Sequence, residues 1–522
     1  MKLRNSMRSI QVGFYKSISW LYFGMMLVIF AICVFCFQMH FGRSEFYQNY
    51  IPVFALLPFG IIFVAGLSRV AELAASRIVR ANRWMIIISV ILLLTQVYAL
   101  KCYFFSTDWD ARTLIFLSQS VAHGEDLSMY KEYFSKYPNN LFLGWIFAMI
   151  YRVAHVIGFH AFEYVLVLCV QCALNVLTGF LFAKILKKLV GDNRFVVLGY
   201  AVYVLLIGMS PWVSIPYSDS MGLIFPVWIL YIYLNRNKCW LAFLPWAAIG
   251  ILSGFGYKIK PQIIIVLIAI LIVTVLKKRQ GLDWKKVLQC TAGAFFGIIV
   301  AILLAGAAVR SMNVPLDTER EFRMPHYFMM GQCPEGLGVW CPEDVGFSDS
   351  YGTVKERDAA DWERARSRIR EMGVGGVINQ FTRKTLTNYY DGTFGWSGEG
   401  TFFFEVRENT GSLGEQFFRG LYYTRDYASE GRYYTVWSNF VQMLWITCLL
   451  FSIFAAFSER TDEKNVVMLS IIGLSIFEVL FEARARYLYI YVPFYILLAV
   501  CGLAVIMNKK GKFYRRNRNE TV

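Results

Sequence analysis

The feature that most constrains this chain is a long series of apolar stretches separated by polar or basic segments. Many of these stretches run for about 17–23 residues with few charges, which is the length needed to cross roughly 30 Å of hydrocarbon. Of the 522 residues, 57% are hydrophobic and only 17% are charged. This composition excludes an ordinary soluble protein and predicts an all-α, polytopic membrane protein.

The net charge of +16 does not indicate a nucleic-acid partner. The chain has 52 Lys and Arg residues against 36 Asp and Glu, which in a soluble protein would suggest nucleic acid. In a membrane protein the same excess is expected, because Lys and Arg concentrate in cytoplasmic loops. The first apolar stretch is too long for a signal peptide and lacks a small-residue cleavage site, so we expect it to remain as a span.

Hydropathy and loop charge together predict about twelve spans with both termini in the cytoplasm. The basic segments expected inside are the N-terminus, residues 69–83, 184–194, 236–238, 277–286, 460–464 and the C-terminal tail. The predicted spans are 17–38, 51–67, 84–105, 163–184, 195–211, 221–235, 239–256, 261–276, 287–309, 437–457, 466–482 and 487–507.

The apolar stretch 141–158 is the exception in this scheme. If it crossed the membrane, every later basic loop would lie outside, against the rule that such loops stay in the cytoplasm. Arg152, His155 and His160 also suit an interfacial helix better than a lipid-exposed span. We therefore expect 141–158 to lie at the outer surface, with Pro138 at the first position of the helix.

The resulting division of the chain has four parts. Residues 1–83 form two N-terminal spans with a basic cytoplasmic loop, and residues 84–309 form a transmembrane module with an outer segment at 106–162. Residues 310–436 form a large outer segment, and 437–522 hold the last spans and a basic tail. A segment as long as 310–436 is typical of a functional element or a small domain.

Ionisable residues of both signs gather at the predicted outer ends of the spans. A carboxylate can remove a proton from a hydroxyl, and lysines and arginines can bind a phosphate and stabilise its charge as it leaves. Such a set suits transfer of a group from a lipid-borne phosphate to an alcohol, although each residue alone could be a solvated loop end or a membrane anchor. The residues are Asp108, Asp110, Lys136, Asp219, Lys258, Lys260, Glu482, Arg484 and Arg486.

The order of these motifs resembles the GT-C superfamily of membrane glycosyltransferases. It is similar in particular to the protein mannosyltransferase and aminoarabinose transferase group (glycosyltransferase family 39-like). The motifs, all expected on the outer face, are DWDART at 108–113, FSKYPNNLFLGW at 134–145, PYSDS at 216–220, GYKIKP at 256–261 and EARARYLYIYVP at 482–493. The sequence departs from the family pattern in two places: Ala111 follows Asp110, and Tyr137 separates Lys136 from Pro138.

The resemblance implies an inverting glycosyl transfer from a polyprenyl-phosphate sugar to a hydroxyl. Of the two carboxylates in DWDART, it favours Asp110 over Asp108 as the general base, and it gives Asp219 a role in orienting the acceptor. The resemblance leaves open whether the site uses a divalent metal, for which Asp110 and Asp219 would be the ligands. The residues expected to hold the donor phosphate are Lys136, Lys258, Lys260, Arg484 and Arg486.

The large outer segment contributes further candidates. His326 could contact the donor phosphate or be structural. Asp391, Trp396 and Glu399 suit a sugar or acceptor, because aromatic faces stack on carbohydrate; the alternative is a glycine-rich turn over an aromatic core. Cys333 and Cys341 could form a disulfide or remain two free thiols.

The expected protein is thus a multi-pass enzyme of the cell membrane with an extracytoplasmic active site. Its partners would be membrane lipid, the lipid-linked sugar, and a glycan, lipid or protein acceptor of the cell envelope. Two other functions stay open. A polysaccharide polymerase or ligase also has many spans and a large outer loop, and a lipid or solute transporter would need charges at the membrane midplane.

Overall fold

The computed structural model describes residues 2–40, 51–77, 81–160, 163–238, 241, 243–278, 284–336 and 338–519. Arg80 and residues 279–283, which belong to the predicted basic loops, lie outside this part. The helices are α1 (Lys2–Phe35), α2 (Val53–Arg77), α3 (Ala81–Cys102), α4 (Trp109–His123), α5 (Lys131–Lys136), α6 (Leu141–Val156), α7 (Glu163–Val190), α8 (Asn193–Tyr203), α9 (Ser218–Gly222), α10 (Ile224–Asn235), α11 (Phe243–Ile259), α12 (Ile264–Lys278), α13 (Trp284–Arg310), α14 (Met324–Gly331), α15 (Pro342–Asp349), α16 (Val354–Tyr389), α17 (Leu413–Tyr422), α18 (Tyr434–Ile453), α19 (Asp462–Leu480) and α20 (Val492–Asn519).

Seven of the described helical segments are long and apolar enough to cross a membrane. They are Gly13–Phe35, Val53–Ala75, Arg83–Cys102, Glu163–Val190, Val287–Arg310, Tyr434–Phe457 and Ala485–Met507. Three shorter apolar segments, Asn193–Gly208, Phe243–Ile259 and Pro261–Leu276, coincide with further predicted spans. The all-α class is as predicted, whereas the count of twelve crossings stays a prediction.

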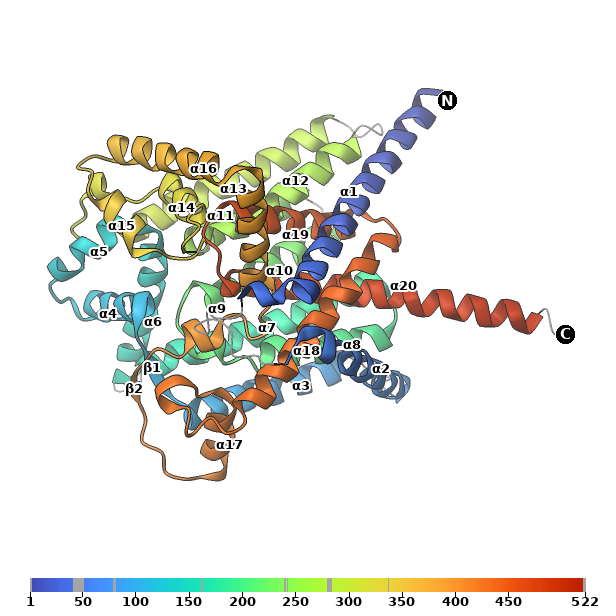
Figure 1. Ribbon diagram of the computed structural model, residues 1–522, viewed down its shortest axis with the longest axis horizontal. Helices are drawn as coiled ribbons and strands as arrows, with labels where there is room; N and C mark the ends of the chain where they lie inside the picture. The colour runs from blue at the N-terminus through green and yellow to red at the C-terminus, as the bar shows by residue number, and fades with distance from the viewer. Residues whose placement is uncertain are drawn as a thin grey trace.

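The predicted outer segments lie together on one side of the helix bundle. In Figure 1 the helices α4, α5 and α6 lie beside α14, α15 and α16, and the two chain ends project from the opposite side. A short antiparallel sheet joins the two segments, because β1 (Phe105–Thr107) pairs with β2 (Phe403–Val406). That this side of the bundle is the outer face stays a prediction.

Helix α6 packs along one apolar face. Leu143, Phe147, Tyr151 and Ala154 are buried on that face, at the helical spacing of three and four residues. The helix has 16 residues, which is shorter than the roughly 20 residues that a straight span needs. Its predicted place at the outer surface stays a prediction.

The long helix α16 belongs to the large outer segment and contacts the spans directly. It consists of two helices joined at Gly373, where φ is 57° and ψ is −175°, a backbone conformation that favours glycine. Near its C-terminal end Lys384 is buried and donates hydrogen bonds to the carbonyl oxygens of Val479 at 2.7 Å and Phe481 at 2.5 Å. The ammonium group thereby satisfies carbonyls at the end of α19, which would otherwise have no partner within the helix.

Small residues allow α11 and α13 to pack with their backbones in contact. A Cβ added at Gly250 would collide with the carbonyl oxygen of Ala294, and one added at Gly254 would lie 2.6 Å from the Cβ of Ala301. In a bilayer this close approach matters, because helices associate there through packing rather than through the hydrophobic effect.

We predict that Gly250→Ala destabilises the protein by about 1–3 kcal/mol, the usual cost of overpacking. The matched control is Gly306→Ala on α13, since a Cβ there meets only Arg310 Nη1, at 3.4 Å. Thermal unfolding in detergent, followed by intrinsic fluorescence, measures both variants. Equal midpoints for the two would contradict the proposed backbone contact.

Candidate functional site

The centre of the site is the carboxylate of Asp219, which is 1% exposed. Asp219 lies in the short helix α9, and its Oδ1 accepts a hydrogen bond from Lys260 Nζ. Its Oδ2 accepts a second one from Arg486 Nη1 at 2.9 Å. Burial alone would raise the pKa of Asp219, but the charges of Lys260 and Arg486 outweigh it and hold the pKa below its usual value.

Arg486 extends this pair into a network that includes the large outer segment. Its Nε donates to Glu399 Oε2 at 2.5 Å, and Arg484 Nη1 lies 3.4 Å from Glu399 Oε1. Arg484 Nε also donates to Glu482 Oε1 at 3.1 Å. Positive and negative groups therefore alternate, as buried charges require.

Asp110 lies at the edge of this network. It is the second residue of α4 and follows Trp109, whose φ of 61° is unusual for a residue with a side chain. The guanidinium carbon of Arg486 lies 4.8 Å from the centre of the Trp109 ring. Burial raises the pKa of Asp110, although a hydrogen bond with Tyr133 and the charge of Arg486 oppose the rise. A carboxylate with a raised pKa is better suited to accept a proton.

Tyrosines fill the space around these charges. The ring of Tyr217 lies 4.8 Å from that of Trp109, and its hydroxyl accepts a hydrogen bond from Asn140 at 3.0 Å. Burial raises the pKa of Tyr137 above its usual range, and the negative charges of Asp110 and Glu482 raise it further. Tyr137 therefore lies close to both carboxylates, within the site.

Three candidates from the sequence lie outside the network. Asp108 is largely exposed and pairs with Arg112 at 3.4 Å. Lys136 pairs with Asp349 of the large outer segment at 2.9 Å and with Glu132 at 3.3 Å, so it holds the two outer segments together. Lys258 is half-buried, one residue before the end of α11.

His326 lies within the large outer segment and is 1% exposed. Its Nδ1 is 2.7 Å from Ser348 Oγ, and the Ser348 hydroxyl donates to Asp361 at 2.8 Å. Burial lowers the pKa of His326 to about 4, so the ring is neutral at physiological pH. Its Nε2 is buried and makes no hydrogen bond within the described residues, and the predicted contact with phosphate stays a prediction.

Asp391 and Trp396 have well-defined structural partners. The Asp391 carboxylate accepts hydrogen bonds from the backbone of Thr393 at 2.7 Å and of Gly395 at 2.9 Å. Trp396 is fully buried, and its indole N–H donates to the carbonyl oxygen of Tyr422 at 2.8 Å. These contacts match the alternative of a glycine-rich turn over an aromatic core, whereas Glu399 of the same stretch joins the charge network.

The sequence analysis missed Glu478. It lies in α19 and is fully buried, and neither of its carboxylate oxygens has a hydrogen-bond partner within the described residues. Lys260 and Lys384 are close enough to act on it electrostatically. The available signal was a single acid within the apolar stretch 466–482, which in a membrane segment indicates a functional residue.

Cations already occupy the carboxylate of Asp219 in this arrangement, and a metal shared with Asp110 stays a prediction. Both carboxylate oxygens of Asp219 already accept hydrogen bonds from cations. Within the described part of the chain, two groups of three side chains place their donor atoms within 4.8 Å of one another, and neither group includes Asp110 or Asp219. We therefore assign no reaction step at this site to a metal.

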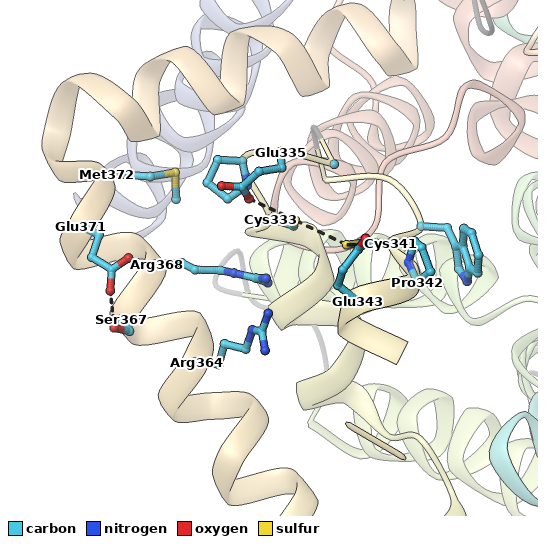
Figure 2. A pocket seen from close by; sticks show the side chains of 13 residues that line it. Cys333, Glu335, Cys341, Pro342, Glu343, Arg364, Ser367, Arg368, Glu371 and Met372 are labelled. Carbon is cyan, nitrogen blue, oxygen red and sulfur yellow. Dashed lines mark hydrogen bonds between the residues drawn. The ribbon is translucent and has the colours of Figure 1, made fainter. Parts of the chain in front are cut away.

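A large pocket lies elsewhere, within the large outer segment (Figure 2). It has a volume of about 920 Å³ and is bounded on one side by Arg364 and Arg368 of α16. Arg368 is held by Asp344 through bonds of 2.6 and 2.8 Å. Cys333 and Cys341 border the pocket as two thiols, with their sulfur atoms 3.7 Å apart. We place the functional site at the Asp219 network instead, because a buried carboxylate of raised pKa, Asp110, lies beside its cations.

The apolar helices define the chain as a polytopic integral membrane protein. Residues 12–505 match a family described as conserved hypothetical integral membrane protein, and the chain belongs to this family. No curated protein and no solved structure matches the chain.

We predict that Lys260→Met destabilises the protein by up to about 3–5 kcal/mol, because Asp219 Oδ1 loses its buried ionic partner and only the bond from Arg486 to Oδ2 remains. Lys258→Met is the matched control, because Lys258 is only half-buried, whereas Lys260 is 3% exposed. The midpoint of thermal unfolding in detergent should fall strongly in Lys260→Met and only slightly in Lys258→Met. Similar decreases in the two midpoints would contradict the claim that the ion pair of Lys260 with Asp219 stabilises the fold.

Proposed function

We propose that the protein is a membrane glycosyltransferase that moves a sugar from a polyprenyl phosphate to a hydroxyl acceptor. The observation that supports this most strongly is the convergence of Asp110 with the network of Asp219, Lys260 and Arg486. These residues come from four separate segments of the chain, all at span ends predicted to lie at the outer face. The site combines a carboxylate of raised pKa with a cluster of cations.

The cations supply the binding side of the proposal. Each arginine has five N–H donors in a planar fork that matches phosphate. Within the described residues, Arg486 donates from Nε and Nη1, which leaves Nη2 for a ligand. Lys260 and Arg484 flank it, so a phosphate here would meet three positive groups whose charge stabilises the leaving group.

The carboxylate of Asp110 supplies the chemical step. As the acceptor hydroxyl attacks the anomeric carbon, Asp110 accepts its proton, and the bond from that carbon to the phosphate oxygen breaks. The electron pair leaves with the polyprenyl phosphate, and the configuration at the anomeric carbon inverts. Asp219 keeps Lys260 and Arg486 in place for this step.

Asp219, Lys260 and Arg486 are all buried in this structure. A cavity of about 10 Å³ lies beside the network, lined by Glu399 and Arg484 but not by Asp110, Asp219 or Lys260. Glu399 belongs to the large outer segment, whose contact with Arg486 covers the network. Substrate entry therefore requires this segment to move, as lids do in many enzymes.

We predict that Asp110→Asn lowers the transfer rate by about 10²–10⁴-fold, the usual contribution of a general base. Asp108→Asn is the matched control and should keep its activity within about threefold, since that carboxylate is exposed and paired with Arg112. The assay uses full-length protein in liposomes with a radiolabelled polyprenyl-phosphate sugar and envelope extract as the acceptor. Full activity in Asp110→Asn would exclude Asp110 as the general base.

The pH profile tests the same carboxylate independently. The base must be deprotonated, and burial raises the pKa of Asp110. Activity should therefore fall as the pH drops, with a midpoint above the ordinary Asp value of about 3.9. A flat profile down to that value would contradict the role of Asp110.

The product identifies the reaction class. Addition of a single sugar supports the proposal, whereas a ladder of products would indicate a polymerase. Movement of the lipid across the bilayer without any acceptor would indicate a transporter.

A further inference from the structure

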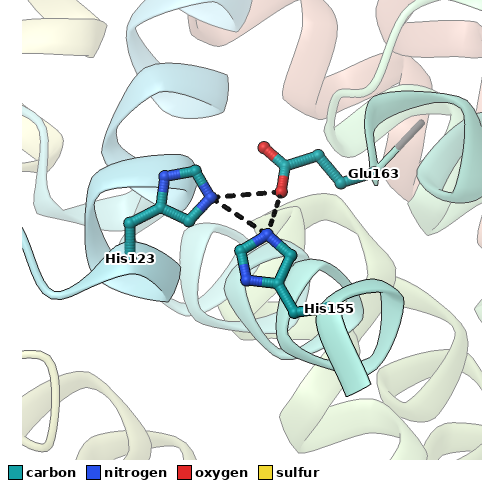
Figure 3. A group of neighbouring side chains, drawn as sticks. All are labelled: His123, His155 and Glu163. Atoms are coloured by element: carbon teal, nitrogen blue, oxygen red, sulfur yellow. Dashed lines mark hydrogen bonds and ion pairs between the residues drawn. The ribbon is translucent and has the colours of Figure 1, made fainter. Parts of the chain in front are cut away.

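A second cluster of side chains lies where α4, α6 and α7 meet. Figure 3 shows His123 at the end of α4, His155 near the end of α6 and Glu163 at the start of α7, all pointing to one place. The chain has five histidines, and the ring of a third one, His160, lies 4.7 Å from that of His155. Three of the five are therefore within one small region.

The donor atoms of the three side chains form a compact triangle. Nε2 of His123 lies 3.1 Å from Nε2 of His155 and 3.2 Å from Glu163 Oε2, and the remaining side, from His155 Nε2 to Glu163 Oε2, is 2.7 Å. In a tetrahedral zinc site any two ligand atoms are separated by about 3.3 Å, because zinc bonds to nitrogen and oxygen are about 2.0–2.1 Å long. The observed triangle is close to one face of such a tetrahedron.

We propose that His123, His155 and Glu163 bind a divalent transition metal of the zinc class. Two imidazole nitrogens with one carboxylate oxygen favour zinc or a similar ion over magnesium or calcium, which prefer oxygen ligands alone. A bound ion replaces the protons that would otherwise separate the two ring nitrogens. His160 or a water molecule completes the coordination.

The surroundings support this assignment. Nδ1 of His123 lies 3.7 Å from Glu125 Oε1, and a carboxylate next to the second ring nitrogen is common for a histidine that binds a metal. The side chain of Glu163 is 9% exposed, whereas those of His123 and His155 are 35% and 26% exposed. The site is therefore anchored in the protein and open to solution, so that the metal can exchange.

The metal has a positioning role relative to Asp110. Asp110 and His123 belong to the same helix, 13 residues apart, which corresponds to about 20 Å at 1.5 Å per residue. That distance keeps the ion away from Asp110. By tying the end of α4 to α6 and α7, the ion fixes the helix that carries Asp110.

The test measures metal binding by full-length protein, purified in detergent without a histidine tag and dialysed against Zn²⁺. We expect one equivalent of zinc by elemental mass spectrometry in the wild type. His155→Asn and Glu163→Gln should each weaken binding by more than about 100-fold, since even outer partners of metal ligands contribute roughly 10- to 100-fold. Cys333→Ser is the matched control, because Cys333, Cys341 and Asp344 form the other group of suitable donor atoms.

A second measurement needs no variant. Co²⁺ added to the wild type should give the intense visible absorption of a tetrahedral site, and Zn²⁺ should raise the unfolding temperature in a way that a chelator reverses. Absence of zinc from the wild type, or binding that is kept in His155→Asn and lost in Cys333→Ser, would overturn the proposal.

Discussion

The architecture of the site depends on the two hydrogen bonds that Asp219 accepts from Lys260 and Arg486. These bonds tie α9 to the turn after α11 and to the start of the last span. A buried charge without partners is very costly, so all three segments must meet for any one of the three groups to be tolerated. The bond from Arg486 to Glu399 then brings in the large outer segment. One ionic network thus links spans that are far apart in the sequence.

The same network gives the site its chemical character. Acidic partners make it possible to bury the cations, and Nη2 of Arg486 makes no hydrogen bond within the described residues. Asp110 lies beside the network and forms no direct ion pair within the part of the chain that the structure describes, so burial can raise its pKa. The separation of roles between Asp219, which holds the cations, and Asp110, which can accept a proton, is the basis of the proposed glycosyl transfer.

The sequence predicted the helical class and several of the apolar helices, because these follow from local hydropathy. It also placed Asp110, Asp219, Lys260 and Arg486 among the candidates, because ionisable residues at span ends are costly. The structure brings these residues together, and their role in function stays a prediction. The sequence did not predict which side chains pair with one another. Lys136 pairs with Asp349, 213 residues away, and the histidine cluster forms from the ends of three helices. Such pairings depend on how the helices pack, and a local sequence pattern does not determine which distant residues meet.

The central claim is that Asp110 and the cations around Asp219 belong to one binding site for a lipid phosphate. It is tested most directly by a cryo-electron-microscopy structure of the protein in lipid nanodiscs with a polyprenyl phosphate bound. The account predicts phosphate density in contact with Arg486 and Lys260, with the Asp110 carboxylate facing the same space. Phosphate bound elsewhere, or Asp110 opening to a separate cavity, would contradict it.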